Sequence, residues 1–98
     1  MQIRARQTLK QFWERHPSAE IPLRTWYAIV QKTAWSGPSD VKRQFGNAVD
    51  FVADNRVIFD IGGNKYRLIA VIHFNRGKLF VRHVLTHAEY DEGKWKNE

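Results

Sequence analysis

Four residues in the second half of the sequence are of the types that phosphodiester chemistry needs. Arg67 and Arg82 each fall in the middle of a predicted strand, where a rigid sheet would hold two guanidiniums that can each bind a phosphate through paired hydrogen bonds. His87 and Tyr90 follow the last predicted strand at the i, i+3 spacing that shares one face of a helical turn. An imidazole and a phenol could therefore reach a phosphodiester held by the arginines.

Such a set is suited to cleavage of RNA without a metal ion. A ribose 2′-OH attacks the adjacent phosphorus, which requires a base, cations for the charge that builds on the phosphorane oxygens, and an acid for the leaving 5′-oxygen. Arg, Lys, His and Tyr can fill these roles, whereas metal-dependent cleavage needs clustered carboxylates. The acidic residues are dispersed and cysteine is absent, so we expect no metal site and no cofactor.

A structural role is the alternative for each arginine. An arginine in apolar surroundings needs an anion, and Asp60, which lies across from Lys65 or Arg67 depending on the register, could serve one of them but not easily both. Three further residues on the same predicted face are candidates for RNA binding: Lys65, Arg56 and His73.

Two amphipathic helices are predicted in the first half of the chain. One runs from about Thr8 and stops before Pro17, and apolar residues keep helical spacing from Leu23 to Ala34 in a second helix that Ser18 can cap. The two helices would form a hairpin whose apolar stripes need a surface to cover. Two shorter elements are also expected, an edge strand at residues 2–5 and a helix at residues 38–44 with Gly46 just beyond its end.

The apolar period changes to two after residue 56, which predicts an antiparallel meander. Its strands cover residues 57–61, 66–74 and 79–85, with turns at residues 62–64 and 75–78. The helical hairpin would pack on one face of this sheet, and Thr86 to Glu89 form a capping-box pattern for a short C-terminal helical turn. The expected fold is a two-layer α+β domain with a sheet of three to four strands. Trp95, beyond the last element, is either tail packing or an interface anchor.

The register of the last hairpin decides which face the arginines share. A two-residue turn at Arg76 and Gly77 places His83 and Leu85 on the helix-covered face and Arg67 with Arg82 on the other. A three-residue turn with a bulge would shift the pairing by one residue and separate the two arginines. We prefer the two-residue turn because the alternative buries the second arginine without an anion.

Length and charge limit the remaining possibilities. The 98 residues suffice for one domain spanning residues 1–98, because single cores are typically built from about 100 to 200 residues. The net charge of +6 favours a polyanionic partner. No apolar run approaches a membrane span, and the first residues lack the apolar stretch of a signal peptide, so we expect no membrane association and a cytoplasmic location.

Three segments together resemble the HigB-type toxins of bacterial type II toxin-antitoxin systems, within the RelE-like endoribonuclease superfamily. The segments are Gly63-Asn64-Lys65-Tyr66-Arg67-Leu68, then Phe80-Val81-Arg82, then Thr86-His87-Ala88-Glu89-Tyr90-Asp91, and the resemblance extends to Phe12-Trp13-Glu14-Arg15-His16-Pro17 and residues 23–27. It implies a RelE-like fold and a ribosome-dependent mRNA endonuclease, or mRNA interferase, that cuts translated mRNA and inhibits growth. It also implies silencing by a helix-turn-helix antitoxin of the HigA type, through which alone the toxin would meet operator DNA.

The resemblance assigns individual positions as well. Arg67 and Arg82 match the phosphate-binding arginines of the superfamily, and Tyr90 matches its C-terminal catalytic tyrosine. Lys65 and His87 fall where relatives place lysine or histidine for proton transfer, and their separate roles stay open. The competing function is a noncatalytic RNA-binding or ribosome-binding module that uses the same basic face.

Overall fold

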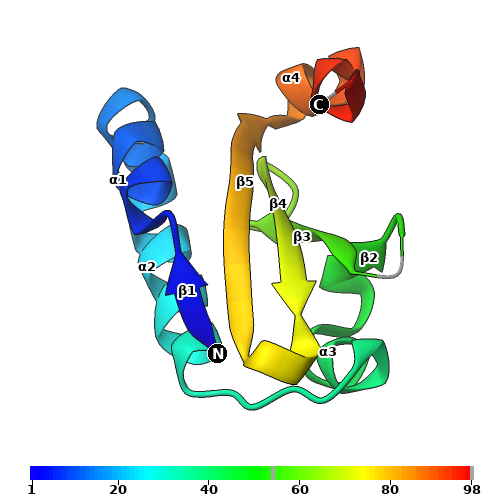
Figure 1. The fold of residues 1–98 in the computed structure, drawn as a ribbon. Coiled ribbons are helices and arrows are strands. Elements are labelled where there is room, and N and C mark those ends of the chain that lie inside the picture. The colour runs from blue at the N-terminus through cyan, green and yellow to red at the C-terminus, as the bar shows by residue number, and fades with distance from the viewer. Residues whose placement is uncertain (54, 98) are drawn as a thin grey trace.

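The computed structural model of the chain describes residues 1–53 and 55–97, arranged around one five-stranded sheet (Figure 1). The strands lie in the order β1-β5-β4-β3-β2. Along the chain the elements are β1 (Gln2–Arg4), α1 (Arg6–Arg15), α2 (Glu20–Gln31), α3 (Pro38–Phe45), β2 (Val49–Phe51), β3 (Arg56–Ile61), β4 (Tyr66–His73), β5 (Lys78–Thr86) and α4 (His87–Glu92). Short 3-10 turns cover Pro17–Ala19, Gly46–Ala48, Phe74–Arg76 and Lys94–Asn97.

The helical hairpin forms as predicted, with differences at its ends. The first helix begins two residues earlier than expected, and Ser18 lies within a 3-10 turn instead of capping α2. Its hydroxyl instead contacts the Tyr66 hydroxyl on β4. The third helix ends at Phe45, and the following Gly46 adopts a positive φ of 57°, as expected of a residue that ends a helix.

The sheet is larger than predicted and is mixed. The meander of β3, β4 and β5 is confirmed, but the expected antiparallel sheet of three to four strands is corrected to five, because β2 adds antiparallel to β3 and β1 adds parallel to β5. Both additional strands are only three residues long. The edge strand expected at residues 2–5 is confirmed as β1. The strand β2 was not predicted, because three residues carry too little alternation to be recognised from sequence.

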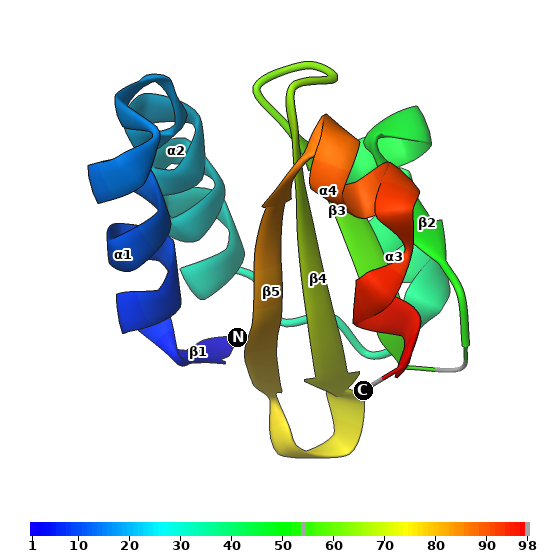
Figure 2. The same cartoon turned by 90° about the horizontal axis from the view of Figure 1, so that it is seen from above.

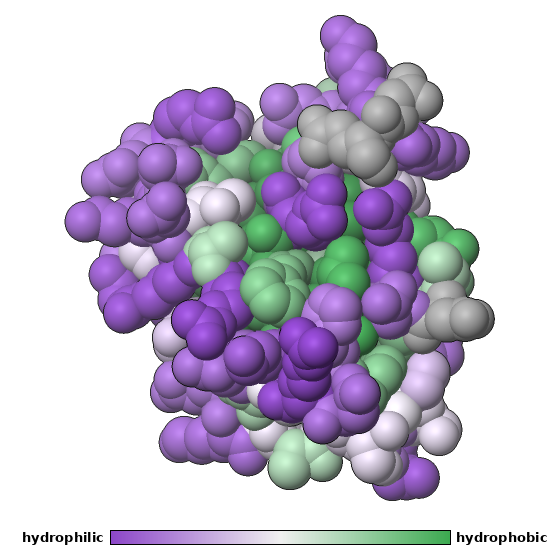
Figure 3. All heavy atoms as spheres, viewed as in Figure 1, coloured by the Kyte–Doolittle hydropathy of each residue, from purple (hydrophilic) through white to green (hydrophobic). Residues whose placement is uncertain are grey.

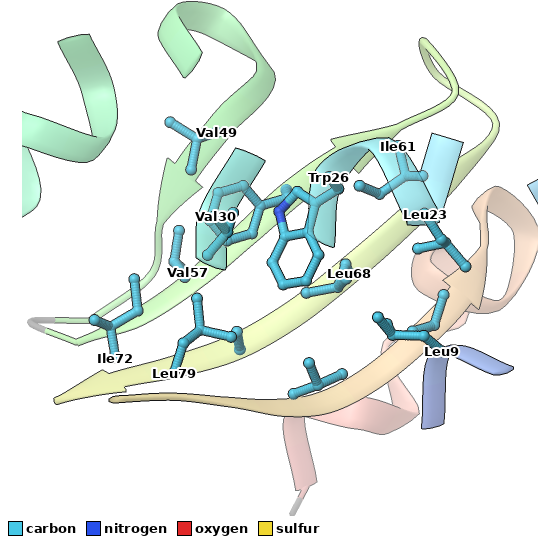
Figure 4. Packing of buried hydrophobic residues seen from close by; sticks show 14 of the residues in the cluster. Leu9, Leu23, Trp26, Val30, Val49, Val57, Ile61, Leu68, Ile72 and Leu79 are labelled. Atoms are coloured by element: carbon cyan, nitrogen blue, oxygen red, sulfur yellow. The ribbon is translucent and has the colours of Figure 1, made fainter. Parts of the chain in front are cut away.

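The two faces of the sheet bury different clusters. One face packs against α1, α2 and α3 and holds the main core; in Figure 4 the Trp26 side chain points from α2 toward Leu68 of the sheet. The other face carries a small cluster in which Ile58 and Ile69 lie beneath Trp95 of the C-terminal turn. In Figure 2 the helical hairpin and this turn lie on opposite sides of β4 and β5.

A bulge in β5 replaces the uniform register that the sequence predicted. Ile69 pairs with His83 whereas Ala70 pairs with Val81, which leaves Arg82 without a partner opposite it. The connection is also longer than two residues, because His73 pairs with Lys78. An extra residue in one strand reverses the face of the sheet to which each later side chain of that strand points. The bulge therefore exchanges the faces of the β5 side chains that follow Val81.

The bulge corrects three placements on β5. His83 and Leu85, expected on the helix-covered face, pair with residues of the opposite face, while Val84 is buried in the main core. Neighbouring side chains along a strand point to opposite faces. Val81 and Val84 both point into the main core, so Arg82, which follows Val81, and His83, which precedes Val84, point away from it. Arg82 and His83 therefore both face away from the helices, so the expected common side for Arg67 and Arg82 survives for a different reason.

Candidate active site

Arg67 is the only charged or polar residue that is buried among those the structure describes, with 8% of its surface exposed. It stands opposite Asp60 in the β3–β4 ladder, and its Nε lies 3.2 Å from the Asp60 Oδ1. The guanidinium also donates from Nη1 to the backbone carbonyls of Tyr66 and Asn64 at 3.1 and 3.4 Å, and from Nη2 to the Asn64 side chain. The structural alternative for Arg67, a pair with Asp60, is confirmed.

These contacts fix the Arg67 guanidinium but do not occupy all of its N–H donors. Its hydrogen bonds to residues 1–53 and 55–97 occupy three of the five N–H groups that a guanidinium carries. The Nε N–H faces the Asp60 carboxylate, so the second N–H on Nη2 is the one left to donate to an anion. Arg67 is thus both a structural residue that ties the Asn64 turn to the sheet and a cation available to a ligand.

Tyr90 lies over this guanidinium. Its ring centroid is 5.4 Å from the Cζ atom of Arg67, within the range of a cation–π contact. The residue comes from α4, whose start is fixed by a capping box in which Thr86 Oγ1 accepts from the Glu89 N–H and the Glu89 carboxylate accepts from the Thr86 N–H. The capping pattern predicted from sequence is therefore confirmed, and it aims the phenol at the open face of the sheet.

His87 occupies the first turn of the same helix and is half-exposed. Its Nδ1 lies 3.1 Å from the Asn64 carbonyl, and its Nε2 lies 3.1 Å from the Asp91 carboxylate. Both neighbours are acceptors, so only an imidazole that carries both protons can donate to both. These two contacts hold the ring beside the turn that Arg67 organises.

Arg82 differs from Arg67 in its exposure and in its partners. It is exposed at the β5 bulge, and no residue within 1–53 or 55–97 forms a hydrogen bond or ion pair with its side chain. Its guanidinium is thus available to an incoming anion on the side of the sheet that also carries Arg67 and Tyr90.

A hollow of about 360 Å³ opens beside Arg67 and Tyr90. Its opposite wall comes from α3, the Gly46–Ala48 turn and β2, and the lining residues there are Lys42, Asn47, Val49 and Asp50. This wall was not predicted from the sequence, because residues 38–50 were interpreted only as a helix and the residues that follow it. The one available signal was polar residues flanking the short apolar segment at Val49.

The loop before α3 is held by an ionised carboxylate. Asp40 accepts from the Ser36 backbone N–H and hydroxyl, both at 2.8 Å, and pairs with Arg43 at 3.2 Å. The Ser36 N–H, then its hydroxyl, and the nearby Arg43 charge hold the pKa of the Asp40 carboxyl below its usual value. This arrangement steadies the helix that carries Lys42.

The three candidate RNA-binding residues lie in different places. Lys65 is exposed in the turn between β3 and β4, and its carbonyl accepts from the His87 N–H at 3.1 Å, which places it beside the site. Arg56 and His73 lie toward the other end of the sheet, where His73 packs edge-on against Phe80 at 5.3 Å. Along β4, at about 3.3 Å per residue, His73 is roughly 20 Å from Arg67. The structure therefore brings only Lys65 close to the four candidate catalytic residues.

In Figure 3 hydrophilic residues cover most of the face that is seen, while apolar residues show in the middle of the view and in smaller areas at its right edge and bottom. Among residues 1–53 and 55–97, no three acidic or histidine side chains gather in a way that could hold a metal ion. None of the helices in this part of the chain is long and apolar enough to cross a bilayer.

Comparison with known proteins decides the family. A family model described as "HigB_toxin, RelE-like toxic component of a toxin-antitoxin system" matches residues 19–93. The chain belongs to the HigB toxin family. This match spans every residue of the candidate site, and membership of the HigB family implies a cognate antitoxin as partner.

Two HigB proteins illustrate the similarity. The "mRNA interferase HigB" of Escherichia coli O6:H1 (strain CFT073) is 31% identical over 93 residues, which cover 94% of this chain and 90% of that protein. The "mRNA interferase toxin HigB" of Escherichia coli K12 is 29% identical over 92 residues, covering 93% of this chain and 88% of the relative. The α+β fold with its helical hairpin is compatible with the RelE-like description of the family.

Proposed function

We propose that the chain is an mRNA interferase, an endoribonuclease toxin that cleaves translated mRNA on the ribosome and thereby inhibits growth. The observation that carries the proposal is the cation–π contact between Arg67 and Tyr90, beside a hollow and on the same side of the sheet as the exposed Arg82. The names of the HigB relatives support the same activity. Residues 1–98 act as one domain in the cytoplasm.

The reaction follows from the chemistry of the residues. Arg82 and the remaining Nη2 N–H of Arg67 bind the scissile phosphate, and the two guanidiniums offset the charge that builds on the phosphorane oxygens. Tyr90 and His87 carry the two proton transfers, one from the 2′-OH and one to the 5′-oxygen. These groups need no metal ion and no cofactor. Lys65, beside His87, adds a phosphate contact, and Arg56 and His73 bind RNA farther along the sheet.

The hollow offers room for the nucleotide next to the cleaved bond. At about 360 Å³ it lies at the lower end of the range typical of small-molecule sites. Lys42 donates from Nζ to the Val49 carbonyl at 3.2 Å, which holds its ammonium on the far wall. The hollow is lined by two cations, Lys42 and Arg67, and by two carboxylates, Asp50 and Asp60, so it offers space for a nucleotide and no net positive charge for its phosphates.

The antitoxin is proposed to be a helix-turn-helix protein of the HigA type that shields or distorts the basic face. An unneutralised toxin would stop the growth of its host, and operator DNA would be bound only through the antitoxin complex. Normal growth of cells that express the chain without a neighbouring antitoxin gene would contradict this part of the proposal.

Inducible expression with mapping of mRNA 5′ ends tests the function. We expect new 5′ ends within open reading frames after induction, and their loss from a message whose start codon is removed. Full-length mRNA in growth-arrested cells would support the noncatalytic ribosome-binding alternative. Cleavage that is equal in translated and untranslated messages would contradict ribosome dependence.

A further inference from the structure

The C-terminal turn crosses the face of the sheet that carries the candidate site. It begins after α4 at Gly93, whose φ of 76° reverses the chain, and it continues through the 3-10 turn Lys94–Asn97. Trp95 in this turn is 6% exposed and packs against Ile58 and Ile69 of the sheet. In Figure 2 the turn lies across the strands on the side opposite the helical hairpin.

Trp95 contacts Tyr90 twice. The two rings stack with centroids 5.2 Å apart and an interplanar angle of 12°. The indole N–H donates to the Tyr90 backbone carbonyl at 3.0 Å, and the Gly93 N–H donates to the same carbonyl at 3.1 Å. The backbone and the ring of Tyr90 are both tied to a residue that is itself locked against the sheet.

Such support is needed because α4 alone cannot hold a side chain still. It has six residues, and helices much shorter than about 12 residues are marginal in water without tertiary contacts. Arg67, on β4, also contacts the Tyr90 ring, and its Cζ lies 5.4 Å from the ring centroid. The phenol is thus located by one cation from β4 and one indole from the C-terminal turn.

We propose that Trp95 is a positioning residue for the cleavage reaction, acting through Tyr90. The inference rests on the proposed function, because it assumes that the Tyr90 phenol takes part in proton transfer. Trp95 does not touch the RNA. It sets the distance between the phenol and the phosphate, and a displacement of about 1 Å in such geometry can reduce a rate about 100-fold.

Cleavage of mRNA on programmed ribosomes by purified Trp95→Ala and Trp95→Phe variants tests the proposal. Phenylalanine keeps a ring that can stack and loses only the indole N–H. We expect Trp95→Ala to cleave at least about tenfold more slowly at saturating ribosomes, with an unchanged half-saturation concentration, and Trp95→Phe to stay within about threefold of the wild type. Equal losses in both variants, or a loss confined to ribosome affinity, would overturn the proposal.

A variant at a second buried residue, far from Tyr90, serves as the control for a loss of stability. Val30 is fully buried in the main core on α2, so Val30→Ala lowers the melting temperature without touching the C-terminal turn. At a temperature well below both transitions we expect Val30→Ala to cleave at the wild-type rate. If Val30→Ala loses as much activity as Trp95→Ala, Trp95 only stabilises the fold.

NMR spectroscopy can report the position of the Tyr90 phenol independently of an activity measurement. The chain has three tyrosines, so the ring signals of labelled Tyr90 are identified in NMR spectra by their loss in Tyr90→Phe. We expect the ring-current shift from the indole to disappear in Trp95→Ala and to persist in part in Trp95→Phe. Unchanged Tyr90 signals in Trp95→Ala would overturn the proposal. Absence of cleavage by the wild type would instead refute the proposed function, and the NMR result would still decide whether Trp95 holds Tyr90.

Discussion

The guanidinium of Arg67 lies over the ring of Tyr90, with Cζ 5.4 Å from the ring centroid. One residue belongs to a central strand and the other to a six-residue helix near the C-terminus. The contact joins a buried cation to a phenol on the open face. Asp60 pairs with the arginine from the neighbouring strand, and a capping box fixes the start of the helix that carries the tyrosine.

Arg82→Ala is expected to reduce mRNA cleavage about 100-fold, the usual size of the loss when one group that stabilises transition-state charge is removed. Arg82 is exposed and unpartnered within the described residues, so the melting temperature and much of the ribosome affinity should stay unchanged. Arg76→Ala, in the turn of the same hairpin, is the matched control. Wild-type cleavage by Arg82→Ala would remove this residue from the site.

Tyr90→Phe is expected to reduce cleavage by at least about 100-fold, because a proton-transfer group typically contributes 10² to 10⁴ in rate. The variant keeps the ring that contacts Arg67 and Trp95, so its thermal unfolding should match the wild type. Growth inhibition after induction gives the same readout in cells. A variant that still arrests growth and cleaves mRNA normally would show that the phenol has no chemical role.

Asp60→Ala is expected to destabilise the fold by about 1–3 kcal/mol, because it leaves the buried Arg67 charge without its carboxylate. The estimate is below the range for fully buried pairs because the Asp60 side chain is 33% exposed. Glu20→Ala, which breaks an exposed pair with Arg24, should cost less than about 1 kcal/mol. Urea unfolding measures both, and equal small losses would mean that the Arg67 pair adds little.

Asp40→Asn is expected to lower stability at neutral pH and to have little effect in acid. The pKa of Asp40 is lower in the folded chain than in the unfolded chain, so its stabilising contribution is complete above the unfolded value of about 4 and is lost as the pH falls through the folded value. Urea unfolding of both proteins between pH 2 and pH 7 checks this, since the difference between them should shrink toward pH 2. A difference that is constant with pH would contradict it.

Much of the fold could be predicted from sequence because its periodicities are strong. The helical hairpin, the meander and the Thr86 to Glu89 capping box all follow from spacing and residue type, whereas the partner of Asp60 depended on a register that the sequence left open. The bulge could not be predicted, because residues 79–85 alternate without a glycine or other break that marks an extra residue. It is favoured by the burial of Val84 in the main core.

The site was predicted in part for the same reason. Tyr90 and His87 were placed together by helical spacing, whereas the Lys42 wall comes from a separate segment that only the folded sheet brings near. Trp95 could not be assigned between packing and an interface, since nothing in the sequence shows that Gly93 returns the chain to the sheet. The contacts made by this tryptophan exist only in three dimensions.

A double-mutant cycle between Arg82 and Tyr90 shows whether the two side chains act on one phosphate, because residues that act on the same bond lose activity non-additively. Single-turnover mRNA cleavage on programmed ribosomes is measured for the wild type, Arg82→Ala, Tyr90→Phe and the double variant. We predict that the double variant cleaves about as slowly as the slower single variant. Losses that multiply fully would show that the guanidinium and the phenol act independently, and would contradict a shared scissile phosphate.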